Sequence, residues 1–282
     1  MDGRAEAPAA GTVLNALATG TGSAFAIDEY VRATVSLGGE EVVGRVRDAP
    51  AADTALIEGA VASTLAEFGE ERGATVETES AVPMAAGLKS SSAAANAAVL
   101  ATLDALDRTG EVSREDAARI GVDAAREAGV TVTGAFDDAS ASMLGGLTIT
   151  DNDRDRLVHR DAVDWHVAVY VPPDRAYSAD ADVERCRRVA PVAELVEELA
   201  REGRYRIAMT VNGFAFASAL DRSTEPMLDA LPTVPGVSLS GTGPSYVAVG
   251  GRDAVASVAD VWGDRPGTVL ETRTQTAGAR PL

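Results

Sequence analysis

The chain has 282 residues, and 43 Asp and Glu against 25 Lys and Arg give it a formal net charge of −18. This charge disfavours nucleic acid and anionic membranes as partners, because both bind basic protein surfaces. The one cysteine excludes an internal disulfide framework, no apolar run reaches the ~18 residues of a membrane-spanning helix, and the first residues lack the layout of a signal peptide. We therefore expect a globular cytoplasmic protein.

The acidic excess coincides with a near-absence of lysine, since Lys89 is the only lysine in the chain. Salt screens the repulsion between carboxylates, so an acidic surface that is poor in lysine favours a cytoplasm of high salt concentration. An acidic protein from an ordinary salt environment and an arginine-favouring genome is the alternative interpretation. Of the two, we favour the halophilic one.

The N-terminal half contains both predicted strands and predicted helices. Residues up to 28 are small and glycine-rich, which indicates a strand, a loop and a short turn or helix. Apolar residues recur at helical spacing over 53–68 and predict an amphipathic helix. The other elements expected here are strands over 31–37 and 75–81, helices over 93–106 and 113–129, and a loop from 131 that leads into a short helical stretch.

A polar, charged segment at 151–164 is the best candidate for a domain boundary, and it divides the chain into residues 1–150 and 151–282. A β-hairpin tip at this place would explain the segment nearly as well. Strands and helices interleave without the strict alternation of a doubly wound sheet, so the predicted fold class is α+β. The C-terminal part is expected to hold strands at 165–171, 237–240, 246–249 and 269–273, with helices within 182–231 and over 253–262.

The strongest chemical signal is the loop PMAAGLKSSS, from Pro83 to Ser92, which joins a predicted strand to an alanine-rich helix. The N-terminus of a helix offers free backbone N–H groups and a positive dipole end to phosphate, and Gly87 permits close approach of a ligand. Serine hydroxyls can bind phosphate or Mg²⁺. The alternative is a serine-capped helix beside one remaining lysine. The GxxxxGK[ST] pattern does not fit, because Leu88 precedes Lys89 and Pro83 replaces the first glycine.

Two further loops could complete a site. SGTGPS, at 240–245, lies between two predicted strands, where a plain tight hairpin is the alternative. TGAFDDAS, at 133–140, places Asp137 and Asp138 among small and apolar residues, where carboxylates could act as a general base and as a Mg²⁺ ligand. The two histidines belong to no zinc or Ser-His-Asp pattern.

Together these loops resemble the motifs of the GHMP kinase superfamily, which includes galactokinase, homoserine kinase and mevalonate kinase. PMAAGLKSSS matches the second motif, P-x-x-x-G-L-G-S-S-A, with Lys89 and Ser92 in place of Gly and Ala. SGTGPS matches the third motif, and APAAGTVLNALATGTGSAFAID, at 7–28, looks like the first. The lysine in the serine loop and the paired aspartates are most similar to the archaeal type of shikimate kinase.

The resemblance implies a two-domain α+β fold of the GHMP kinase type. Its N-terminal domain would be similar to the second domain of ribosomal protein S5, and its C-terminal domain would be ferredoxin-like. The implied reaction uses ATP and Mg²⁺ to phosphorylate the 3-hydroxyl of shikimate, giving shikimate 3-phosphate and ADP. Another small alcohol, such as homoserine or a mevalonate derivative, is the alternative substrate. A non-catalytic binding protein with the same fold is a third hypothesis.

The resemblance also carries roles over to residues of this chain. Asp138 is the expected catalytic base, with Asp137 kept as the other candidate, and Lys89 is inferred from its place in the loop to neutralise the transferring phosphoryl group. Ser91 and Glu127 are the candidate Mg²⁺ ligands, although Glu127 is equally well explained as a surface residue. The residues expected to bind the nucleotide are Pro83, Met84, Ala85, Ala86, Gly87, Leu88, Lys89, Ser90, Ser91, Ser92, Ala93, Gly241 and Gly243.

Overall fold

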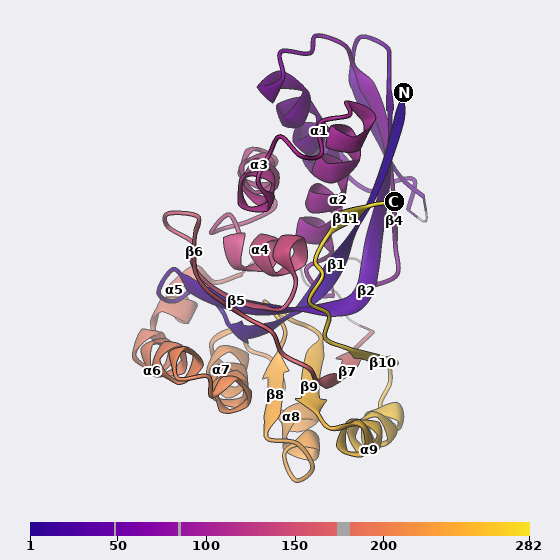
Figure 1. Ribbon diagram of the computed structural model, residues 1–282. Helices are drawn as coiled ribbons and strands as arrows, with labels where there is room; N and C mark the ends of the chain where they lie inside the picture. The colour runs from indigo at the N-terminus through magenta and orange to yellow at the C-terminus, as the bar shows by residue number, and fades with distance from the viewer. Residues whose placement is uncertain (48, 84–85, 174–180) are drawn as a thin grey trace.

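Two β-sheets with helices packed against them form this computed structural model, which describes residues 1–47, 49–83, 86–173 and 181–282 (Figure 1). The first sheet has seven strands in the order β11-β1-β2-β4-β3, with β5 paired to both β2 and β6. Its strands are β1 (Asp2–Leu14), β2 (Thr21–Leu37), β3 (Val42–Val46), β4 (Ala74–Ser80), β5 (Leu147–Asp151), β6 (Arg156–Asp161) and β11 (Arg280–Pro281). The second sheet, in the order β10-β7-β9-β8, contains β7 (His166–Val171), β8 (Gly236–Leu239), β9 (Tyr246–Gly250) and β10 (Thr268–Arg273).

The long hairpin of β1 and β2 connects the two halves of the molecule. Its strands pair antiparallel and run from the end of the first sheet that holds both chain termini down to the second sheet (Figure 1). There β1 contacts α6 (Ala190–Arg201) and α7 (Tyr205–Ala219), and β2 contacts β10. Short alanine and glycine side chains in β1 permit this close packing on both sides of the strand.

Helices of the N-terminal half pack on the first sheet and form an alanine-rich core with it. These helices are α1 (Ala55–Glu67), α2 (Ser90–Ala105), α3 (Arg114–Glu127) and α4 (Phe136–Leu144). Helix α2 packs directly on β1 and β2. The approach is so close that a Cβ at Gly3 of β1 would lie 2.1 Å from the carbonyl oxygen of Ala101. The small residues at the C-terminal end of α2 thus let this helix and β1 pack closely together.

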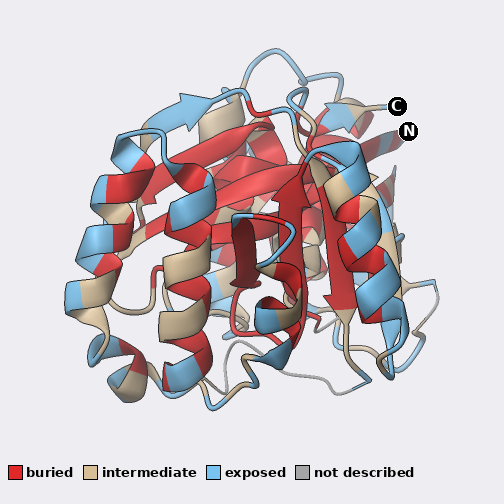
Figure 2. Cartoon of the chain, turned by 90° about the horizontal axis from the view of Figure 1, so that it is seen from below, coloured by how far each residue is buried: buried red, intermediate tan, exposed pale blue. Residues whose placement is uncertain are grey.

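The C-terminal half adds its own helices and shares part of its core with the hairpin. Its helices are α5 (Val183–Arg187), α6, α7, α8 (Glu225–Ala230) and α9 (Arg252–Gly263). Figure 2 shows buried strands between helices whose exposed faces point outward. One apolar cluster contains Phe25 of β2 and Leu88 beside Phe216 of α7 and Val247 of β9. The two halves are therefore packed against each other through side chains of both.

The observed elements confirm the predicted α+β class and correct several details. Strand β2 is longer than the predicted strand at 31–37. Its first part was not predicted as a continuous strand, because it consists mostly of small residues. The charged segment after residue 150 is a hairpin: β5 and β6 pair antiparallel around a turn. Asp137 and Asp138 lie in the first turn of α4 rather than in a loop. The division into 1–150 and 151–282 stays a prediction.

Within the described ranges, no helix combines the length and apolarity that crossing a bilayer would require.

The acidic composition predicts that stability depends on salt. Raising KCl from ~0.1 M to ~1 M shortens the Debye length from about 10 Å to about 3 Å and weakens repulsion between exposed carboxylates. With a net charge of −18, we expect the midpoint of thermal unfolding to rise by on the order of 10 °C over this range. Circular dichroism measures the change. The control is the same titration near the isoelectric point of about 4.5, where the effect should shrink. Full folding and activity in salt-free buffer would contradict the halophilic interpretation.

Candidate active site

The N-terminus of α2 presents an anion-binding surface. Lys89 is its N-cap residue, and the helix then begins with Ser90, Ser91 and Ser92. No hydrogen bond of the three serine hydroxyls occurs in the part of the chain that the structure describes. The first-turn N–H groups of a 16-residue helix also lack partners within the helix, and its dipole places positive charge here. The free donors and hydroxyls fit a phosphate group.

The glycine-rich loop at 240–245 packs directly against the loop that precedes α2. The Ser240 hydroxyl donates to the carbonyl oxygen of Gly87 at 2.9 Å, and the backbone N–H of Ser245 donates to that of Ala86 at 3.3 Å. Gly87 has φ +79°, and a Cβ there would lie 2.4 Å from the carbonyl oxygen of Ser240 and 3.0 Å from that of Gly243. Two loops predicted from the sequence to act together therefore touch.

A substitution at Gly87 is predicted to separate these loops. Gly87→Ala places a Cβ against the backbone of Ser240 and adds a left-handed backbone penalty, so we expect the free energy of unfolding to fall by about 3 kcal/mol. Gly69→Ala is the matched control, since Gly69 has φ +65° but no atom within 4 Å of the added Cβ, and it should cost only about 1 kcal/mol. Denaturant unfolding measures both. Equal losses in the two variants would contradict the contact's importance.

The end of β1 and the turn that follows it meet the same glycine-rich loop at Gly241. The backbone N–H of Gly241 donates to the Thr12 hydroxyl at 2.8 Å, and the Asn15 side-chain amide donates to the Gly241 carbonyl oxygen at 2.9 Å. Asn212 of α7 accepts the backbone N–H of Asn15 at 2.9 Å. Thr12, Asn15 and Asn212 were not predicted as site residues. What marks these residues is that they are polar, uncharged and buried. A single sequence does not show which polar side chains are buried, so it gave no signal that could have found them.

Lys89 and Asp138 form an ion pair inside the site. Lys89 Nζ lies 2.7 Å from Asp138 Oδ1, and the side chains are 8% and 16% exposed. Burial and the neighbouring charge of Asp137 raise the pKa of Asp138 to about 7, although Lys89 opposes this rise. Lys89 adopts φ +64°, the left-handed region that favours glycine. A strained lysine at a position where the related motif has glycine indicates a functional reason for its side chain.

A small cavity of about 50 Å³ joins these residues. Its lining includes Asn15, Lys89, Asp137, Asp138 and Gly241 and the segment that leads into α4; the full set is Asn15, Ala16, Leu17, Lys89, Thr131, Val132, Thr133, Ala135, Asp137, Asp138, Gly241 and Thr242. All three predicted loops and the turn after β1 therefore converge on one place. The volume accommodates the reacting groups of a substrate rather than a whole nucleotide.

The remaining predicted residues lie around this cavity or away from it. Ser91 is exposed on the first turn of α2, and Glu127 is exposed at the last residue of α3; neither lines the cavity. Pro83 is exposed, and Ala93 is buried in the core below the helix start. Met84 and Ala85 lie outside the described residues. The roles given to all of these residues stay predictions.

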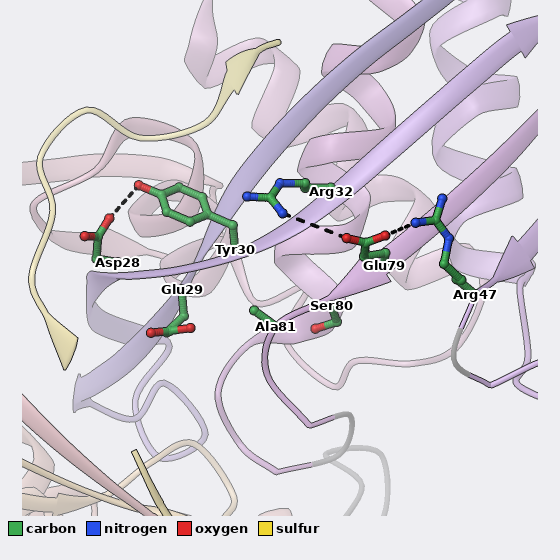
Figure 3. A pocket seen from close by; sticks show the side chains of 8 residues that line it. All are labelled: Asp28, Glu29, Tyr30, Arg32, Arg47, Glu79, Ser80 and Ala81. Atoms are coloured by element: carbon green, nitrogen blue, oxygen red, sulfur yellow. Dashed lines mark hydrogen bonds and ion pairs between the residues drawn. The ribbon is translucent and has the colours of Figure 1, made fainter. Parts of the chain in front are cut away.

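A larger pocket of about 480 Å³ lies on the outer face of the first sheet (Figure 3). Its charged side chains largely satisfy one another: Glu79 lies between Arg32 and Arg47 and pairs with both. The Tyr30 hydroxyl donates to Asp28 at 2.9 Å. The lining contains no residue of the three motif loops, so the smaller cavity is the better candidate active site.

Oxygen donors at the start of α2 and in the small cavity are of the kind that Mg²⁺ prefers when it binds together with phosphate. Mg²⁺ prefers a few carboxylate or hydroxyl oxygens together with phosphate oxygens, rather than a site made of protein ligands alone. The described residues contain no cluster of three or more histidine, cysteine or carboxylate side chains that could hold a metal unaided. Serine hydroxyls at the start of α2 and the carboxylates of α4 agree with a metal that arrives with its phosphate ligand.

The chain is similar to curated kinases over its full length. The family model for the GHMP kinases N terminal domain matches residues 55–146. A shikimate kinase of Halobacterium salinarum is 63% identical over 282 residues, which cover 99% of each chain. A shikimate kinase of Methanosarcina mazei is 48% identical over 284 residues, covering 99% of this chain and 96% of the relative.

Solved structures share the fold at low sequence identity. A homoserine kinase from Cytophaga hutchinsonii superposes with a TM-score of 0.80 at 17% identity and covers 100% of this chain and 97% of its own. The mevalonate kinase of Methanococcus jannaschii gives a TM-score of 0.78 at 14% identity, with 96% and 98% covered. At these identities the likeness establishes the fold only, and evidence on the substrate comes from the relatives of higher identity.

Proposed function

Because this chain belongs to the shikimate kinases of the GHMP kinase family, we propose that it transfers the γ-phosphoryl group of ATP to the 3-hydroxyl of shikimate. The observation that carries the chemistry is the largely buried ion pair between Lys89, the N-cap of α2, and Asp138 of α4, whose charged atoms lie 2.7 Å apart. Homoserine or a mevalonate derivative as substrate is disfavoured, since relatives of 63% and 48% identity over the whole chain are both shikimate kinases.

Asp138 acts as the general base in this proposal. It lines the cavity, and its pKa of about 7 lets it accept a proton near neutral pH. As the acceptor hydroxyl attacks the γ-phosphorus, its proton passes to the Asp138 carboxylate, and the bond from the γ-phosphorus to the bridging oxygen of ADP breaks. Such a transfer depends mostly on positioning and on stabilisation of charge.

Lys89 supplies positive charge where negative charge accumulates. Its ammonium group lies between Asp138 and the glycine-rich loop, since a Cβ at Gly241 would be 3.0 Å from Lys89 Nζ. In this position it orients the Asp138 carboxylate and can contact an oxygen of the transferring group. A preorganised donor of this kind stabilises the transition state without rearrangement at the moment of reaction.

The start of α2 binds the nucleotide phosphates through its N–H groups and its serine hydroxyls. We propose Ser91 and Glu127 as contacts to Mg²⁺, which would neutralise charge on the phosphate oxygens. Ser91 is supported by its exposure on the first turn of α2, beside Lys89. Glu127 is supported only by its sequence spacing from Asp138, because it does not line the cavity.

A panel of small alcohols tests the proposed function. Shikimate, homoserine and mevalonate are each incubated with ATP and Mg²⁺ in concentrated KCl, and ADP release is followed. We expect turnover with shikimate and values of kcat/KM at least about 10²-fold lower with the other two. Preference for another alcohol, or no ADP release with shikimate, would contradict the proposed substrate.

A further inference from the structure

Asp137 is a buried carboxylate that has no cation partner among the described residues. Its residue is 5% exposed, and the salt bridges of the described chain do not include it, although Asp138 next to it pairs with Lys89. A buried, unpaired charge is costly unless hydrogen bonds compensate it. Asp137 also lines the small cavity. The charge is therefore held where a ligand can reach it.

Asn152, in the turn between β5 and β6, fixes one oxygen of this carboxylate. Its side-chain amide donates to Asp137 Oδ1 at 2.7 Å, while its own Oδ1 accepts the backbone N–H of Asp137 at 3.1 Å. The Thr150 hydroxyl donates to the same Asn152 Oδ1 at 2.7 Å. Two donors on one atom determine that this atom is the amide oxygen, so the NH₂ group must face Asp137.

The second oxygen of Asp137 receives no hydrogen bond from any residue in the described part of the chain. It lies beside Gly22 of β2, where a Cβ would come within 2.6 Å of it. Glycine at this position therefore leaves room for the carboxylate between β2 and Asn152. The result is a rigid acceptor with one satisfied oxygen and one oxygen free for a ligand.

We propose that Asp137 binds the hydroxyl that neighbours the phosphoryl acceptor, and that Asn152 is the residue that positions Asp137 for this contact. The inference rests on the proposed function. Asp137 and Asp138 are consecutive in the first turn of α4 and line the same cavity. Because both carboxylates line one cavity, a substrate whose 3-hydroxyl reaches Asp138 brings its neighbouring 4-hydroxyl into the same cavity as Asp137. In this proposal Asp138 takes the proton of the reacting 3-hydroxyl, and Asp137 accepts a hydrogen bond from the 4-hydroxyl of shikimate.

Deoxy analogues of the substrate test this contact in the unmodified enzyme. We expect 4-deoxyshikimate to show a kcat/KM about 10- to 100-fold lower than shikimate, the loss typical of a hydrogen bond to a charged group. 5-Deoxyshikimate is the matched control, because it lacks a hydroxyl that is not adjacent to the acceptor, and it should lose less. Equal kcat/KM for shikimate and 4-deoxyshikimate overturns the proposal. Absence of turnover with shikimate itself contradicts the proposed function instead.

Variants of Asp137 and Asn152 then show whether these residues cause the preference for shikimate over 4-deoxyshikimate. In Asp137→Ala the ratio of kcat/KM between shikimate and 4-deoxyshikimate should fall to about 1, and in Asn152→Ala it should fall several-fold, with KM for ATP unchanged. Asp153→Asn, an exposed carboxylate on the same turn, should keep the wild-type ratio. Circular dichroism verifies folding, and the wild-type comparison stands even where a variant does not fold.

A metal-binding role for Asp137 is the competing outcome. The proposal is overturned if Asp137→Asn needs more Mg²⁺ for its half-maximal rate but keeps the wild-type ratio of kcat/KM between shikimate and 4-deoxyshikimate. The proposal is supported if Asp137→Asn loses this ratio of kcat/KM while the Mg²⁺ concentration for half-maximal rate stays unchanged.

Discussion

Asp138→Asn is expected to abolish phosphoryl transfer while ATP still binds. The amide has nearly the size of the carboxylate but cannot accept the proton of the substrate hydroxyl, so kcat should fall by about 10³-fold or more. The nucleotide contacts proposed at the start of α2 do not involve this side chain, so the Kd for ATP should change less than about threefold. Single-turnover assays and titration calorimetry measure the two quantities.

Asp137→Asn is the comparison that separates the two carboxylates. It should retain more transfer than Asp138→Asn, because Asp138 and its contact with Lys89 remain. Full activity in Asp138→Asn together with an inactive Asp137→Asn would transfer the role of base to Asp137.

The pH profile of the wild-type enzyme follows from the same carboxylate. Burial and the charge of Asp137 raise the pKa of Asp138 to about 7. A base acts only when it is ionised, so kcat/KM for shikimate should fall about tenfold for each unit of pH below this pKa and level off above it. A profile that stays flat down to pH 5 would contradict the assignment.

Lys89→Ala is expected to lower kcat by about 10²- to 10³-fold, the loss typical of one preorganised donor to a transition-state charge. Lys89 is the only lysine in the chain, so no other lysine side chain can replace it. Lys89→Arg keeps the charge but not the compact shape, and it should restore only part of the rate. Coupled measurement of ADP release over a range of ATP and shikimate concentrations gives kcat and KM for each variant.

Lys89→Gly separates the charge of the side chain from the conformation of the backbone. Glycine adopts the φ of +64° seen at this position without strain, whereas alanine retains a penalty of about 1 kcal/mol. The two variants should therefore be equally inactive, and Lys89→Gly should be the more stable by about that amount. A large difference in activity between them would show that the backbone, and not the ammonium group, limits the reaction.

Much of the site could be predicted from the sequence because its loops consist of small residues in recognisable patterns. Gly87 and the loop at 240–245 carry little side-chain volume, and this property both marks them in the sequence and lets them touch. Asp138 was favoured over Asp137 as the base because it stands seven residues before Gly145, and this role stays a prediction. Its pairing with Lys89 could not be predicted, because the sequence indicated a loop at 133–140, whereas Asp138 lies in the first turn of α4.

Other parts of the site depend on contacts that a single sequence does not record. Asn15 bonds to Asn212, which is 197 residues away along the chain. Asn152 lies in a turn that resembles any polar turn until β5 and β6 place it beside Asp137. Strand β6 was not predicted because its residues are mostly charged and half or fully exposed. Such edge strands are defined by their neighbours more than by their own composition.

The bonds at Gly241 have a consequence for how this enzyme can be recombined. The N–H and the C=O of one glycine from the second half bond to Thr12 and Asn15 from the first. A fragment cut after residue 150 would retain Lys89 and both carboxylates but lose the loop that supports Gly87. A chimera that exchanges one half between related kinases therefore needs residues at positions 12 and 15 that can still bond to Gly241. For the same reason, sequence changes in one half are constrained by the residues of the other.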